Sequence, residues 1–126
     1  MLVDDDKDIL TTFEIGLEEY GFDVDGFNNP FEAVAKFKAS NEKSYELLLI
    51  DLKFDEPYNI DGFQIYQQMR DSRRILPCVC FITGFQDYYD EMESLFPEID
   101  VHCFIRKPIE IIDLAARLKQ ELHASQ

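Results

Sequence analysis

Two short apolar runs without polar alternation constrain the fold of this chain more than any other feature. They are Leu47–Ile50 and Cys78–Ile82. A strand with one face in water alternates apolar and polar residues, whereas a strand buried on both faces does not. Because helices cover both faces of a parallel sheet, the two runs predict central strands of such a sheet.

Amphipathic patterns between the apolar runs predict helices. Residues 8–20 carry apolar side chains three or four positions apart, and Gly21 follows them as a helix stop. Asn29 before Pro30 is typical of an N-cap followed by proline in the first turn. The expected strands are 1–3, 22–26, 47–50, 78–82 and 101–105, and the expected helices are 8–20, 30–39, 62–71, 86–96 and 109–123. This alternation predicts an α/β fold, a doubly wound parallel sheet with helices on both faces.

The composition indicates one domain over residues 1–126, with 46% apolar residues available for its core. A net charge of −14 argues against direct binding to nucleic acids or to anionic membranes. No apolar run approaches the ~20 residues that cross a bilayer. With three cysteines and no secretory signal, we expect a cytoplasmic protein with reduced thiols. We expect Cys78, Cys80 and Cys103 to be small buried residues rather than metal ligands.

Four of the expected strands lead into a charged or hydroxyl side chain. Carboxylates follow residues 1–3, Asp51 follows the run at 47–50, Thr83 follows the run at 78–82, and Lys107 comes shortly after 101–105. In a parallel sheet these side chains lie along one edge, which is where such folds bind ligands. The combination of carboxylates, a hydroxyl and an ammonium suits metal-assisted transfer of phosphate onto a carboxylate.

Five segments together resemble the receiver domains of two-component response regulators, the CheY-like family. They are Val3–Asp6, Leu49–Leu52, Asp61–Phe63, Ile82–Gly84 and Phe104–Pro108. Their joint order and approximate spacing carry the resemblance, which covers almost the whole chain. It implies a flavodoxin-like sheet with strand order 2-1-3-4-5.

The resemblance also implies the residues of a Mg²⁺ site. Asp51 matches the phosphoacceptor, and Asp4 and Asp5 match the acidic pair that holds Mg²⁺ together with Asp51 and the backbone carbonyl of Lys53. Oxygen ligands are what Mg²⁺ prefers. Without a cation, repulsion among the carboxylates should raise at least one pKa.

Three further positions follow from the resemblance. Thr83 matches the hydroxyl that hydrogen-bonds a phosphoryl oxygen, and Lys107 matches the lysine that pairs with the acyl phosphate. The bond between Lys107 and Pro108 is usually cis in the family. Thr83 and Phe104 match the two switch positions.

The function implied is that of a phosphoacceptor, which is self-modified and autodephosphorylates rather than turning over a free substrate. A sensor histidine kinase or a phosphotransfer protein would donate the phosphoryl group, and an output partner or effector domain would read the switched face. Two alternatives stay open. One is a metal-dependent phosphatase with an aspartyl nucleophile, although such enzymes often carry a carboxylate where this chain has Lys53. The other is a receiver-like interaction module that works without phosphorylation.

Two features depart from the family pattern. The first strand is short, as if truncated at the N-terminus, which we expect to weaken the sheet. The loop after Asp51 is longer than usual and includes Asp55 and Glu56. We expect their charge to slow the capture of anionic phosphodonors.

Overall fold

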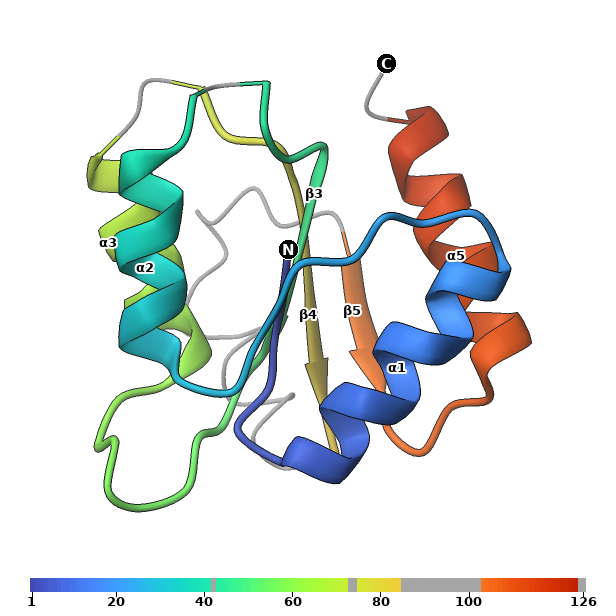
Figure 1. Ribbon diagram of the computed structural model, residues 1–126, viewed down its shortest axis with the longest axis horizontal. Coiled ribbons are helices and arrows are strands. Elements are labelled where there is room, and N and C mark those ends of the chain that lie inside the picture. Colours follow the sequence, from blue (N-terminus) through green and yellow to red (C-terminus); the bar gives the residue numbers. More distant parts are fainter. Residues whose placement is uncertain (42, 73–74, 85–102, 125–126) are drawn as a thin grey trace.

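The computed structural model describes residues 1–41, 43–72, 75–84 and 103–124. Within these ranges, strands and helices alternate along the chain (Figure 1). The elements are β1 (Leu2–Val3), α1 (Lys7–Glu19), β2 (Gly26–Phe27), α2 (Pro30–Ala39), β3 (Leu47–Asp51), α3 (Gly62–Asp71), β4 (Cys78–Thr83), β5 (Cys103–Arg106) and α5 (Ile111–Ala124). The helix expected over 86–96 lies outside the described residues.

The strands form a parallel five-stranded sheet in the order β2-β1-β3-β4-β5, which confirms the expected fold and order. Ile50 of β3 pairs with Val3 of β1 and with Phe81 of β4, and Phe81 pairs with Phe104 of β5. The carboxyl ends of β1, β3, β4 and β5 are therefore level with one another. Figure 1 shows α2 and α3 on one face of this sheet and α1 and α5 on the other.

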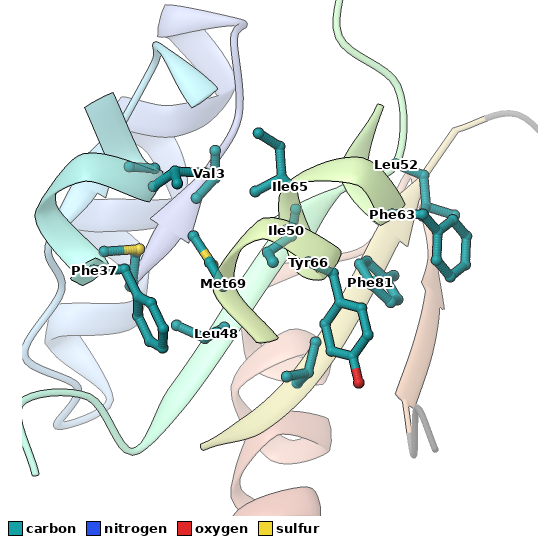
Figure 2. Close-up of a cluster of buried hydrophobic side chains, with 14 of the residues drawn as sticks. Val3, Phe37, Leu48, Ile50, Leu52, Phe63, Ile65, Tyr66, Met69 and Phe81 are labelled. Carbon is teal, nitrogen blue, oxygen red and sulfur yellow. The ribbon is translucent and has the colours of Figure 1, made fainter. Parts of the chain in front are cut away.

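Both faces of the central strands are buried, as the uninterrupted apolar runs predicted. Leu48 and Ile50 of β3 and Phe81 of β4 pack in the cluster beneath α2 and α3 (Figure 2). Leu49 and Cys80 belong to the cluster beneath α1 and α5. Cys78, Cys80 and Cys103 are buried free thiols, as expected.

The helix boundaries follow the predicted capping residues. The Asn29 side chain accepts a 2.9 Å hydrogen bond from the Phe31 N–H at the start of α2. Gly21 adopts a φ of +92° after α1, a backbone conformation in which a side chain is strained. At the start of α3, Asp61 and Gln64 cap each other's backbone N–H groups at 2.9 Å.

The second expected strand is present, but its expected bounds of 22–26 are wrong, because β2 covers only Gly26–Phe27. Its partner β1 begins at Leu2, which pairs with Gly26, so little of the earlier segment has a strand opposite it. Phe22 and Val24 still pack partly buried against the cluster beneath α1 and α5. Their alternation reflected side-chain burial rather than ladder pairing.

The other expected elements within the described ranges are confirmed, with small shifts at their ends. None of the helices in those ranges combines the length and apolarity that a bilayer crossing requires.

Candidate functional site

Three carboxylates converge at the carboxyl edge of the sheet. One oxygen from each of Asp4, Asp5 and Asp51 lies within 4.8 Å of the other two. Asp4 and Asp51 are buried, with exposed fractions of 1% and 7%, and Asp5 is partly exposed. Because Asp4 and Asp5 follow β1 while Asp51 ends β3, the parallel pairing of these two strands places them together. The expected convergence of the three acids is confirmed.

Lys107 joins two of these carboxylates. Its Nζ lies 2.8 Å from Asp4 Oδ2 and 2.9 Å from Asp51 Oδ2. The Lys107 backbone N–H donates to the Thr83 carbonyl at 2.9 Å, and the bond to Pro108 is cis, as the resemblance implied. Burial lowers the pKa of Lys107, but attraction to Asp51 and Asp4 outweighs that effect and raises it. The ammonium therefore stays charged and offsets part of the acidic charge.

Asp51 is held in place by two different donors. Its Oδ1 accepts a 3.1 Å hydrogen bond from the Lys53 N–H, while Oδ2 faces Lys107. Burial raises the pKa of Asp51 from 3.8 to about 7. Attraction to Lys107 lowers this pKa, and repulsion from Asp4 raises it by a smaller amount. The expected rise in pKa is confirmed, although desolvation rather than repulsion is its main cause.

The turn after β1 fixes the Asp4 carboxylate. The Asp6 N–H donates to Asp4 Oδ1 at 2.9 Å, and the Asp6 side chain in turn caps α1 by accepting from Asp8 and Ile9. The cap was missed in the sequence, although an aspartate just before an apolar helical pattern is a known N-terminal signal. Asp6 therefore serves the helix, and Asp4 and Asp5 are left for the site.

Asp5 is held by a loop that is remote in sequence. Its Oδ2 accepts a 2.6 Å hydrogen bond from the Asp55 backbone N–H. Burial raises the pKa of Asp5, while this hydrogen bond opposes the rise. Nothing in the sequence pattern signalled the contact, because any residue except proline supplies a backbone N–H.

Gly62 allows α3 to start directly against the end of β3. A Cβ at this position would lie 2.3 Å from the Asp51 carbonyl oxygen and 2.9 Å from Leu52 Cα. At Gly84 the closest such contact would be 3.8 Å, to Lys107 Cβ. Gly62 is therefore a steric requirement of the site, whereas Gly84 is not.

The two expected switch positions lie on the neighbouring strands β4 and β5, two residues apart in register. Thr83 ends β4 with an exposed fraction of 2%, and it pairs with Arg106, two residues after Phe104. The partly buried Phe104 ring lies 5.8 Å from the Phe81 ring and 6.4 Å from the Phe63 ring, measured between centroids. An aromatic cluster therefore lies next to the strand end that carries the hydroxyl.

The residues present fit a hard divalent cation. Three carboxylates supply oxygen donors within a small volume, and the Lys107 ammonium offsets only part of their negative charge. The site could hold a metal ion through Asp4, Asp5 and Asp51. The role of the Lys53 carbonyl as a further ligand stays a prediction.

Comparison with known proteins agrees with the resemblance noted in the sequence. The chain is similar to the transcriptional regulatory protein PcoR of Escherichia coli, with 27% identity over 126 residues, covering 100% of this chain and 52% of that protein. It is also 27% identical over 126 residues to the alkaline phosphatase synthesis transcriptional regulatory protein PhoP of Bacillus subtilis, covering 100% of this chain and 49% of that protein. The chain thus spans about half the length of these relatives.

A solved structure and a family model complete the comparison. The crystal structure of a CheY-like response regulator receiver domain protein from Methanospirillum hungatei superposes with a TM-score of 0.77 at 25% identity, covering 98% of this chain and 91% of that one. The model of the response regulator receiver domain matches residues 1–119. This chain belongs to the family of response regulator receiver domains, the signalling phosphoacceptors of two-component systems.

Proposed function

We propose that Asp51 is the phosphoacceptor of this receiver domain and that Mg²⁺ is the cation held by Asp4, Asp5 and Asp51. The observation that carries the proposal is the position of Lys107, whose ammonium contacts both Asp4 and Asp51 at the edge where the carboxylates converge. A lone carboxylate at a strand end has many structural uses. A buried carboxylate beside a fixed ammonium and two further acids is suited to accept an anionic group.

The phosphoryl group would come from the phosphohistidine of a sensor histidine kinase or of a phosphotransfer protein. An oxygen of the ionised Asp51 carboxylate forms a bond to phosphorus while the bond between phosphorus and the imidazole nitrogen breaks. Lys107 lies within reach of the new phosphoryl oxygens, and the Lys53 N–H already orients the carboxylate. Bound Mg²⁺ supplies positive charge that reduces repulsion between the carboxylates and the incoming group.

The conformational switch follows from the charge that the phosphoryl group adds at Asp51, about −1.5 to −2 at neutral pH. The Thr83 hydroxyl would turn toward the phosphoryl oxygens, and Phe104 would move in its aromatic cluster. This shifts an equilibrium on the face that includes β5 and α5, where an output partner or effector domain would bind. Water then removes the phosphoryl group in autodephosphorylation. A cytoplasmic location stays a prediction from the sequence.

The test is phosphorylation with acetyl phosphate and Mg²⁺, followed by intact mass spectrometry. Wild type should gain the mass of one phosphoryl group and lose it again with time, whereas Asp51→Ala should gain none. Labelling of Asp51→Ala to the same extent would place the acceptor elsewhere.

The same preparation decides between the two alternatives. Repeated hydrolysis of a small phosphomonoester would indicate an aspartyl phosphatase. Absence of Mg²⁺ binding and of labelling would indicate a module that works without phosphorylation.

A further inference from the structure

The loop between β3 and α3 is built into the carboxylate site. An antiparallel bridge between Lys53 and Asp61 closes it at its base, and the Gly62 N–H donates to the Leu52 carbonyl at 2.9 Å. Phe54 is 6% exposed and packs in the cluster beneath α2 and α3. The residue after this anchor is Asp55, whose N–H contacts Asp5.

The Asp55 backbone is held on its other side as well. Its carbonyl accepts a 3.3 Å hydrogen bond from the Tyr58 N–H, and the Tyr58 ring lies 6.2 Å from the Phe31 ring at the start of α2. The Asp55 N–H therefore comes from a loop that is attached both to the core and to α2. A donor fixed in this way restricts how the acceptor can rotate.

We propose that Asp55 is a positioning residue for the divalent cation, acting through its backbone N–H on the Asp5 carboxylate. With Oδ2 engaged by this N–H, Asp5 already places an oxygen within 4.8 Å of the oxygens of Asp4 and Asp51. The hydrogen bond is thus compatible with the converged arrangement and holds Asp5 in it.

The side chain of Asp55 acts in the opposite sense to its backbone. Its exposed carboxylate adds negative charge close to Asp5, while its N–H donates a hydrogen bond to the Asp5 carboxylate. The two effects can be separated because one belongs to the side chain and the other to the peptide group. The inference rests on the proposed function, since it concerns the cation at the same site.

Two substitutions at position 55 form a matched pair for the test. Asp55→Ala and Asp55→Pro both remove the carboxylate, but only proline removes the N–H. The Mg²⁺ dissociation constant is measured by titration calorimetry without any phosphodonor. We expect Asp55→Pro to bind Mg²⁺ about tenfold more weakly than Asp55→Ala, as suits the loss of one hydrogen bond to a charged group.

A second variant guards against distortion of the loop by the proline ring. In the Asp55→Ala background, an ester replaces the peptide bond between residues 54 and 55, which removes the same N–H without a ring. It should show a similar loss of Mg²⁺ affinity. Asp23→Ala serves as a charge control. Asp23 lines a cavity with Leu17 and Leu118, at the opposite end of the sheet from the carboxylate site. The Mg²⁺ dissociation constant of this variant should stay within roughly twofold of that of wild type, since salt screens distant surface charges.

Nuclear magnetic resonance supplies a readout that is independent of affinity. The Asp55 amide proton of wild type should resonate downfield, as expected for a short hydrogen bond to a carboxylate, and Asp5→Asn should shift it upfield. Equal Mg²⁺ affinity of the alanine, proline and ester variants would overturn the inference while leaving the proposed function in place. Failure of wild type to bind Mg²⁺ would overturn both.

Discussion

Asp51 shows how a single residue combines chemical and structural demands. Its carboxylate is buried, it touches one ammonium and one backbone N–H, and its own backbone ends β3. Burial raises its pKa from 3.8 to about 7, so the folded state takes up a proton that the unfolded chain releases. Burying the ionised carboxylate at this position therefore costs stability at neutral pH.

The first prediction concerns this proton. Between pH 4 and pH 7 the unfolded chain binds fewer protons at Asp51 than the folded protein, so the free energy of unfolding should fall as pH rises. We expect a decline on the order of 2–4 kcal/mol in metal-free protein. Urea unfolding at a series of pH values measures it.

Asp51→Asn is the matched control, because it keeps the shape of the side chain and removes the titration. It should lose most of the decline and be more stable than wild type at pH 7. An equal decline in both proteins would show that other groups cause it. Added Mg²⁺ should stabilise wild type more than the variant, since the variant lacks one charged ligand.

A second prediction at the residue scale concerns Gly62. A Cβ there would lie 2.3 Å from the Asp51 carbonyl oxygen, which is backbone and cannot move aside without disturbing the site. Gly62→Ala should therefore destabilise the fold by about 2–4 kcal/mol, the range of severe steric strain. Gly84→Ala, near the same site, should cost under about 1 kcal/mol, because its nearest contact would be 3.8 Å. Thermal unfolding of the two variants compares them, and similar losses would contradict the steric argument.

At the scale of elements, β1 is unusually short for an interior strand of the sheet. It has two residues, although it lies between β2 and β3. The Met1 ammonium donates to the Leu47 carbonyl at 2.8 Å, and burial lowers its pKa from 8.0 to about 6. A cavity of about 470 Å³ beside it is lined by side chains that include Leu17, Phe22 and Leu47. In the chain as given, the terminal ammonium is thus largely buried and lies beside a cavity with both apolar and polar lining residues.

The third prediction tests the cost of this arrangement. Placing four apolar residues before Met1 should raise the melting temperature, because they extend the ladder, cover the cavity and replace the ammonium by a peptide group. An extension of four Gly and Ser residues removes the ammonium without supplying apolar side chains, so it should give a smaller gain. No gain from the apolar extension would refute the idea.

The two extensions also predict a change in pH dependence. In the protein that begins at Met1, the unfolded chain holds the amine proton to higher pH than the folded state, so stability should rise between about pH 6 and pH 8. Both extended chains should lose this rise. If the extended chains still became more stable over this pH range, a group other than the Met1 amine would cause the rise.

At the scale of the whole molecule, the dominant property is the net charge of −14. The site lies at the carboxyl edge of the sheet together with a loop that adds Asp55 and Glu56, both exposed. Anionic donors approach against this field, whereas a protein partner with a basic surface is attracted by it. The charge therefore favours a protein donor over a small anionic one.

The fourth prediction follows from this field. At saturating Mg²⁺, the double variant Asp55→Asn with Glu56→Gln should be phosphorylated by acetyl phosphate a few times faster than wild type. Phosphoramidate carries less negative charge and should show a smaller difference, and high salt should reduce the difference for both donors. Mass spectrometry over time measures the rates, and unchanged rates with acetyl phosphate would count against the electrostatic argument.

The class of fold, and the edge of the sheet at which the candidate residues lie, could be predicted from the sequence. Uninterrupted apolar runs mark strands buried on both faces, and helical periodicity marks the layers that cover them, because burial is encoded locally in side-chain spacing. Parallel strands end at one edge, so Asp4, Asp51, Thr83 and Lys107 could be assigned to one place before their distances were known. The bounds of the strand expected over 22–26 were wrong because apolar residues also alternate in a segment that packs against the core without a paired strand.

How the site is held together depends on contacts that form only in the folded chain. The contacts of Lys107 with Asp4, of the Asp55 N–H with Asp5 and of Gly62 with the Asp51 backbone join groups that are distant in the chain or involve backbone atoms that every residue shares. No pattern of residue types encodes such contacts, because they depend on the register of the strands and the path of one loop. Burial, which raises the pKa of Asp51, likewise arises only in the folded chain.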